Sequence, residues 1–334
     1  MNPPVILKRL VVVTCVMFLL LLAAMLLGLS TGSTGSSLTA TLQAIWGNQE
    51  TDPTLAAIIW RIRLPRVLLA ALVGATLSVG GLVFQALLRN PLAEPYILGI
   101  SGGSAIGAII GILLGFSPFP GVALLAFSGS MATLLLILLM VSGQTILKRE
   151  SLLLSGVMVN AFCAAVIMFL VSLTQDSRLH NIIFWLMGDL SMADLRQVAI
   201  LGATLLPGLI LIFWFAHPMN LLLAGKETAQ SMGVHVKLVT VTLLIATSFM
   251  VSASVSRSGL LGFVGLVMPH LLRLLLGPDH RVLVPACILG GGAYMVLCDL
   301  LARALPQQGE MPAGVITAMI GAPLFIFLMK TSKR

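Results

Sequence analysis

The chain has 334 residues, of which 58% are hydrophobic and only 9% are charged. A soluble globular domain carries about 25% charged residues, so this composition excludes a water-exposed surface over most of the molecule. The formal net charge of +8 does not indicate nucleic acid, because the 19 lysines and arginines lie singly or in pairs between apolar runs and form no basic stripe.

Long apolar runs predict an all-α, polytopic membrane protein, because about 20 consecutive apolar residues suffice to cross a bilayer as a helix. The first run, 10–29, is longer than the apolar stretch of about 7–15 residues in a signal peptide, so we expect a retained first helix. No hydrophilic stretch is long enough for a second domain, so residues 1–334 are expected to form one transmembrane domain. The predicted spans are 10–29, 64–87, 97–115, 122–142, 151–173, 198–216, 237–256, 260–276, 283–304 and 313–329.

The distribution of basic residues predicts that both termini are cytoplasmic. With ten spans and the N-terminus inside, the inner side holds 12 basic residues: Lys8, Arg9, Arg89, Lys148, Arg149, Lys226, Lys237, Arg273, Arg281, Lys330, Lys333 and Arg334. The outer side holds 7: Arg61, Arg63, Arg66, Arg178, Arg196, Arg257 and Arg303. This bias follows the positive-inside rule.

Glycines recur every four residues in the third span, at Gly103, Gly107, Gly111 and Gly115. Small residues at this spacing allow the backbones of two membrane helices to approach closely. We therefore expect tight helix packing along this face, with a substrate-lining stripe as the other interpretation.

The first of three unusual connections, Trp60-Arg-Ile-Arg-Leu-Pro-Arg66, directly precedes the second span. Its three arginines lie on the predicted outer side and oppose the positive-inside bias, so something other than orientation explains them. One interpretation is snorkelling toward lipid phosphates. The other is a docking surface for an acidic partner, since guanidinium groups suit carboxylates. Residue chemistry alone favours neither.

The other two connections are predicted on the inner side. The segment 89–95 contains two prolines and an asparagine, which indicate a stiff, helix-breaking turn and, at the inner mouth of a pathway, a gate. In the stretch 218–236, acceptable helix formers at 226–232 are bracketed by Gly225 and Gly233. We expect a short helix there, either inert at the membrane interface or in contact with a soluble partner.

Ordered motifs along nearly the whole chain resemble the permeases of the iron-chelate and vitamin B12 ABC importers, the FecCD family. The motifs are Arg63-Leu-Pro-Arg66, Gln85-Ala-Leu-Leu-Arg-Asn-Pro-Leu-Ala-Glu-Pro-Tyr-Ile-Leu-Gly99, Trp185-Leu-Met-Gly188, Gly262-Phe-Val-Gly-Leu-Val-Met-Pro-His270, Asp279-His-Arg281, Asp299-Leu-Leu-Ala-Arg303, Glu310-Met-Pro-Ala-Gly314 and Gly321-Ala-Pro323. So many motifs in one order are not expected by chance.

The resemblance implies a type II ABC importer permease-like bundle of ten transmembrane helices that works as a homodimer, with the translocation path at the subunit interface. It also implies a bacterial inner membrane as the location, with cytoplasmic ABC ATPase subunits inside and an extracytoplasmic solute-binding protein outside. By this similarity Arg61, Arg63, Arg66 and Arg303 would face acidic residues of the binding protein, while Asn90 and Leu92 would form the cytoplasmic gate. The segment that would contact the ATPase is Gly225, Lys226, Glu227, Thr228, Ala229, Gln230, Ser231, Met232 and Gly233.

The chain itself is not expected to be an enzyme. Its only Gly-Lys pair, Gly225-Lys226, is followed by Glu227 and lacks the upstream glycine of a phosphate-binding loop, so ATP would be hydrolysed by a partner chain. We expect no cofactor and no metal site, because the five histidines are widely separated and the four cysteines fall in apolar runs without a CxxC. Membrane lipid is an expected partner, and nucleic acid is not.

A proton-coupled secondary transporter of a bulky solute is the alternative function, and it requires ionisable residues buried in the membrane. Asp299 is the best candidate, but Arg303 four residues later favours an ion pair near the outer mouth. A membrane-embedded enzyme would need a nucleophile or metal cluster, and a passive channel would not need the bracketed inner segment. The substrate stays open among ferric siderophores, haem and cobalamin, because we expect the binding protein to select it.

Overall fold

The computed structural model describes residues 3–31, 53–142, 149–174, 176–306 and 309–331, and within these ranges the chain is all-helical. Lys148, Lys333 and Arg334, which contribute to the predicted charge bias, lie outside the described residues. The helices are α1 (Pro3–Ser30), α3 (Pro53–Ile58), η1 (Ile59–Arg63), α4 (Leu64–Leu88), η2 (Pro95–Leu98), α5 (Ile100–Leu113), η3 (Pro118–Val122), α6 (Ala123–Ser142), α7 (Arg149–Ser172), α8 (Asp176–Met187), α9 (Leu195–Trp214), α10 (Ala216–Ala224), α11 (Lys226–Ser231), α12 (Val236–Ser258), α13 (Val264–Leu276), α14 (His280–Ala304) and α15 (Ala313–Thr331).

Each of the ten predicted spans contains an apolar helix, but two of these helices are short. Among the described residues, 8 helices are long and apolar enough to cross a membrane, and Ile100–Leu113 and Val264–Leu276 are shorter apolar helices. At 1.5 Å per residue, α5 and α13 extend about 20 Å, less than the ~30 Å of a hydrocarbon core. The predicted helical spans 97–115 and 260–276 are therefore longer than the helices that the structure contains, α5 and α13.

Two irregular segments that contact each other explain why α5 and α13 begin late. Before α5, Gly99 has a positive φ of 71° that ends the short helix η2; before α13, Phe263 has a φ of 68°. The Tyr96 hydroxyl donates to the Leu261 carbonyl and accepts from the Leu261 N–H, both at 3.2 Å, and Glu94 Oε1 accepts the Phe263 N–H at 3.1 Å. Non-helical backbone inside a membrane protein requires such partners, because no water is available there.

Helix α4 lies at the centre of the bundle, and glycines allow other helices to approach its backbone. A Cβ on Gly81 would overlap the carbonyl oxygen of Gly265 in α13, and a Cβ on Gly74 would overlap that of Gly291 in α14. On α5, a Cβ on Gly103 or Gly107 would overlap backbone carbonyl oxygens of α6, which confirms the predicted packing role of these two glycines. Gly111 is in close contact with Val122, but Gly115 follows the end of α5 and has no neighbour within 4 Å, so the prediction was wrong for Gly115.

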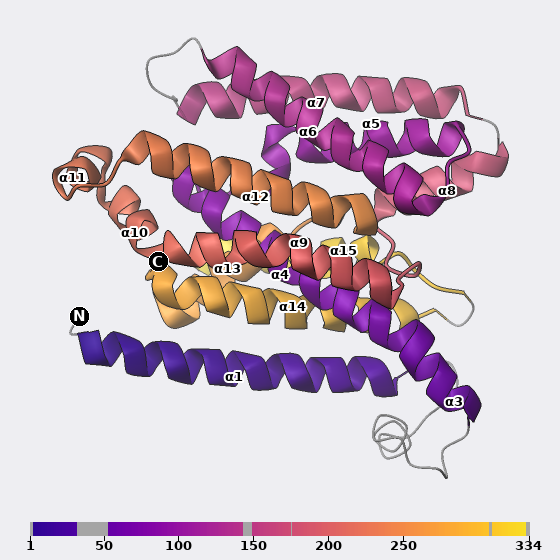
Figure 1. The fold of residues 1–334 in the computed structure, drawn as a ribbon, viewed down its shortest axis with the longest axis horizontal. Helices are drawn as coiled ribbons and strands as arrows, with labels where there is room; N and C mark the ends of the chain where they lie inside the picture. Colours follow the sequence, from indigo (N-terminus) through magenta and orange to yellow (C-terminus); the bar gives the residue numbers. More distant parts are fainter. Residues whose placement is uncertain (1–2, 32–52, 143–148, 175, 307–308, 332–334) are drawn as a thin grey trace.

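The bundle has two ends, which are visible along the long axis of Figure 1. The beginning of α1, the end of α15 and helix α11 lie at one end, which we call the Lys226 end; α3 and α8 lie at the other, which we call the Arg66 end (Figure 1). Helix α12 begins beside α11 and runs to the Arg66 end. The two groups of predicted functional residues therefore lie on opposite ends of the molecule.

Candidate functional site

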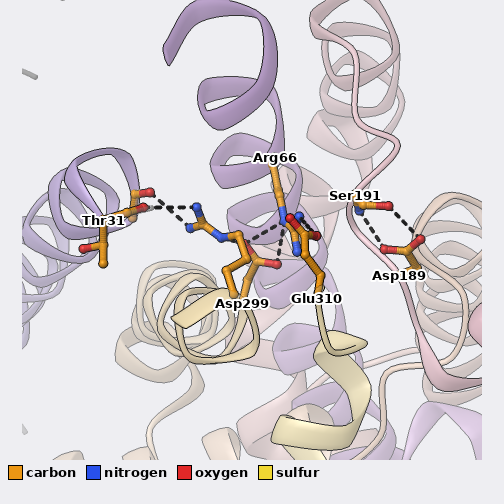
Figure 2. A network of polar contacts seen from close by, with 8 residues as sticks. Thr31, Arg66, Asp189, Ser191, Asp299 and Glu310 are labelled. Carbon is orange, nitrogen blue, oxygen red and sulfur yellow. Dashed lines mark hydrogen bonds and ion pairs between the residues drawn. The ribbon is translucent and has the colours of Figure 1, made fainter. Parts of the chain in front are cut away.

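The Arg66 end holds a cluster of buried charges (Figure 2). Arg66 Nε lies 2.9 Å from Asp299 Oδ1 and 3.1 Å from Oδ2, while its Nη1 pairs with Glu310 Oε2. Arg303 Nε lies 3.1 Å from Asp299 Oδ2. The Asp299 side chain is 1% exposed and that of Glu310 is 51% exposed. Asp299 is thus enclosed between Arg66 and Arg303, while Glu310 binds Arg66 from the exposed side of the cluster.

Backbone carbonyls at the end of α1 complete the arrangement. Arg303 Nη2 donates to Gly28 O at 3.1 Å and its Nη1 to Thr31 O at 3.4 Å, while Arg63 Nη1 donates to Leu29 O at 2.8 Å. The last carbonyls of a helix have no partner within the helix and carry partial negative charge, so they are good acceptors for guanidinium groups. The cluster therefore fastens α1, α4, α14 and the segment before α15 to one another.

The structure places the four predicted docking arginines in different environments. Arg61 is exposed, Arg63 and Arg66 are buried, and Arg303 is half-buried. The predicted Asp299–Arg303 ion pair is confirmed, but sequence reasoning missed Arg66 as the second partner of Asp299. The lone acid within a predicted span was the signal that could have found it, since a buried carboxylate requires a cation.

The predicted short helix at the Lys226 end is present as α11. It begins after Gly225, whose φ is 141°, and ends before Gly233, whose φ is 83°. Both values favour glycine over other residues. Within α11 only Ala229 is buried, and four further residues of the predicted contact segment are exposed around it: Glu227, Thr228, Gln230 and Ser231. The following residue, Met232, is 61% exposed. The segment thus presents most of its side chains outward.

Polar contacts fasten α10, the helix that precedes α11, to the central helices. Asn220 Nδ2 donates to Asp279 Oδ1 at 2.8 Å, and Asn220 Oδ1 accepts the His280 N–H at 2.9 Å. Arg89, at the end of α4, donates to the Leu222 carbonyl. Hydrogen bonds from the Arg281 guanidinium, and then from Asn220, hold the pKa of Asp279 well below its usual range. The α10–α11 segment is therefore joined to both α4 and α14.

The two predicted gate residues lie directly after α4. Asn90 Oδ1 accepts the Leu92 N–H at 2.9 Å, an Asx turn that stiffens the connection. The Leu92 side chain is 45% exposed. Arg89, just before them, has a φ of 46° and anchors this turn to α10. The turn thus lies between the end of α4 and the Glu94–Phe263 contact, on the side of the bundle that carries α10.

Together, these features define a multi-pass helical membrane protein in which central helices connect two polar ends. The sequence profile of the FecCD transport family matches residues 20–331. The chain belongs to this family, whose members are ABC transporter permeases.

Relatives and a solved structure support the same assignment. The chain is 38% identical to the uncharacterized ABC transporter permease protein YvrB of Bacillus subtilis, with 93% of this chain and 91% of that protein covered. It is 41% identical to the vitamin B12 import system permease protein BtuC of Salmonella arizonae, with 83% and 84% covered. A solved structure described as an inward-facing metal-chelate type ABC transporter superposes with a TM-score of 0.85 at 31% identity, with 95% of this chain and 98% of that chain covered.

Proposed function

We propose that this permease imports a bulky metal chelate, either a ferric siderophore, haem or cobalamin, and that a separate ATPase subunit supplies the energy. The observation that carries the proposal is the match to the FecCD transport family over residues 20–331, together with relatives that include the vitamin B12 permease BtuC. Those relatives support the substrate class, and the residues of this chain support separate roles for its two ends.

The α11 segment is the proposed contact with the ATPase. Its exposed side chains, between Glu227 and Met232, surround a single buried anchor at Ala229. Residues of α10 bond to Asp279 and His280 at the start of α14, and to Arg89 directly after α4. A displacement of α11 would therefore be transmitted to the two central helices. Asn90 and Leu92, next to Arg89, are the proposed cytoplasmic gate that such a displacement would open or close.

The Arg66 end is the proposed docking face for an extracytoplasmic binding protein. Arg61 is exposed and directly available to an acidic partner. Arg66 is engaged with Asp299 and Glu310, so a carboxylate of the partner would have to displace Glu310, the exposed member of the cluster. Arg63 and Arg303 would contribute indirectly, because they donate to carbonyls at the end of α1 and so position the helix ends that form the docking face.

Two further features are part of the proposal. The Lys226 end faces the cytoplasm, with both termini there, as the basic residues predict. A second copy of the chain packs against the apolar surface of α7, where Phe162 is 67% exposed and Met168 is 72% exposed. Apolar side chains on this surface need cover from lipid or protein, and a homodimer would provide part of it around a central path.

The proposed docking is tested by charge reversal at Arg61. In vesicles that contain the permease, its ATPase and its binding protein, Arg61→Glu should reduce the stimulation of ATP hydrolysis by the binding protein several-fold. Arg178→Glu is the matched control, because Arg178 lies on α8 and donates to the Leu113 carbonyl rather than joining the cluster. If the binding protein stimulated wild type and Arg61→Glu equally, Arg61 would not be part of the docking face.

The structure provides an argument against the proton-coupled alternative. A coupling acid must take up and release a proton during each cycle. Asp299 is instead enclosed between Arg66 and Arg303, which stabilise its charged form. Asp299 therefore fits a structural ion pair better than a proton-coupling site.

A further inference from the structure

A groove opens at the Arg66 end between helices α6, α9 and α12. It has a volume of about 140 Å³, too small for a bulky chelate. Its lining comes from the beginning of α6, the second and third turns of α9, the last turns of α12 and η3: Phe119, Ala123, Leu124, Phe127, Ile200, Leu201, Thr204, Phe249, Ala253, Ser256 and Arg257. Nothing in the proposed import mechanism uses this site.

The groove is apolar along its length and basic at one end. Arg257 lies in the last turn of α12, and Phe249 lies eight residues earlier, about 12 Å deeper at the rise of an α-helix. Phe249 packs edge-on against Phe127, with ring centroids 5.4 Å apart, and closes the deep end. The groove thus changes from basic at Arg257 to apolar at Phe249, in the same order as a bilayer changes from headgroups to hydrocarbon.

Arg257 has weak partners in the part of the chain that the structure describes. Its guanidinium carbon lies 3.7 Å from the centre of the Phe119 ring, and its Nη1 lies 3.4 Å from Gln197 Oε1. Among the described residues no carboxylate lies within ion-pair distance of it, in contrast to Arg66 and Arg303. A cation held over a ring at the mouth of an apolar groove retains donors that can bind an anion.

The groove is also open to the surroundings of the bundle. Leu124 is 59% exposed, Ile200 is 43% exposed and Phe249 is 40% exposed. In a membrane-spanning bundle, apolar side chains at these helix positions face hydrocarbon. The apolar part of the groove therefore suits an acyl chain, and the arginine at its end suits a phosphate that lies at the level of the headgroups.

We propose that this groove binds one anionic phospholipid, with its phosphate on the Arg257 guanidinium and one acyl chain along Leu124, Ile200 and Phe249. The lipid would cover the seam at which α6, α9 and α12 meet. It would also supply the anionic partner that Arg257 lacks among the described residues.

Native mass spectrometry of the full-length protein, titrated with phosphatidylglycerol, tests the proposal. Wild type should retain one phosphatidylglycerol molecule at least tenfold more tightly than a diacylglycerol with the same chains, and inorganic phosphate alone should not compete. Arg257→Gln should abolish this preference for the phosphate-bearing lipid. Arg257→Lys should keep part of it. Arg178→Gln, which removes the same charge at the same end of the bundle, should retain the wild-type preference.

A second variant tests the apolar half of the groove while Arg257 stays in place. Thr204→Phe adds a ring between α9 and α12 and should weaken the binding of both lipids, because the chain can no longer enter. The proposal is overturned if Arg257→Gln and Arg178→Gln weaken phosphatidylglycerol equally, or if Thr204→Phe leaves its binding unchanged. Cross-links between copies of the chain through Leu124→Cys and Ile200→Cys would also overturn it, because the groove would then be a protein interface.

Discussion

Helices α4 and α7 have the same mean hydropathy over their most apolar stretches, yet they occupy opposite environments. In the continuous helix Thr54–Leu88, which includes α4, 83% of that stretch is buried inside the bundle, against 17% in Ser151–Ser172 of α7. The difference lies in the kind of apolar residue. Helix α4 presents Gly74, Ser78 and Gly81 to its neighbours, whereas α7 presents Phe162 and Met168 outward.

The comparison shows what hydropathy measures in a membrane protein. Lipid tails are as apolar as leucine, so hydropathy alone cannot distinguish a helix at the centre of a bundle from one at its edge. Small residues distinguish them, because they allow backbones to approach closely. Polar residues distinguish them too, because buried charges require partners, and α4 and α14 carry the cluster of Arg66 and Asp299.

The largest expected effect tests the close packing of α4. Gly81→Leu should abolish recovery of folded protein, because the added side chain meets the backbone of Gly265 rather than a flexible side chain. The cost should exceed the ~1–3 kcal/mol typical of overpacking. Val16→Leu, at an exposed position of α1 and away from the α7 surface, should change stability by less than about 0.5 kcal/mol. Thermal unfolding monitored by size-exclusion chromatography measures both, and equal stabilities would contradict the comparison.

The next effect concerns the buried charges at the Arg66 end. Asp299→Ala should destabilise the protein by about 3–5 kcal/mol, because Arg66 and Arg303 would remain buried without their shared carboxylate. The double variant Arg66→Met/Asp299→Leu should recover part of the loss, since it removes two of the charges together. If Asp299→Ala alone were as stable as wild type in thermal unfolding, the cluster would not fasten the helices.

A matched pair of asparagines compares the polar contacts of α10 with the single polar contact of Asn160 on α7. Asn220 bonds to both Asp279 and His280, whereas the amide of Asn160 on α7 makes one bond, 3.0 Å long, to the Tyr96 carbonyl. Asn220→Leu should therefore destabilise the protein by about 1 kcal/mol more than Asn160→Leu, because it leaves a buried N–H without a partner. It should also uncouple ATP hydrolysis from transport. Equal thermal stability and equal coupling in the two variants would contradict this assignment.

The smallest expected effect is a pH dependence at Asp279. Because Arg281 and Asn220 lower its pKa in the folded protein, the charged carboxylate stabilises the fold above its ordinary pKa, and this contribution is lost as the pH falls. Asp279→Asn keeps a capping side chain and should cost about 0.2–1 kcal/mol near neutral pH. The difference in melting temperature from wild type should be constant from pH 8 to about pH 5 and shrink below about pH 4. A difference that grows on acidification would reverse the assigned sign.

Local patterns predicted much of the architecture. The apolar runs located the ten helices, and the glycines at Gly225 and Gly233 located α11, because both signals depend on residues close in sequence. The lengths of α5 and α13 were not predictable in the same way. The residues directly before α5 and α13 are apolar, so their sequence predicts helix. They are not helical because Tyr96 bonds to Leu261 and Glu94 to Phe263, far along the chain.

The polar partners within the candidate site were predictable only in part. The spacing of Asp299 and Arg303 on one helix face indicated their ion pair, whereas Arg66 lies 233 residues from Asp299 and no periodicity connects them. The same limit applies to Asn220 with His280, and to the groove of Arg257, whose lining comes from four separate elements.

The dependence on a separate ATPase is tested most directly by uptake into vesicles. Vesicles that contain the permease and its ATPase, supplied with ATP and a binding protein loaded with cobalamin or a ferric siderophore, should accumulate one of these chelates against its gradient. Vesicles with the permease alone should not accumulate it, with or without a proton gradient. Uphill uptake by the permease alone, without nucleotide, would contradict the account.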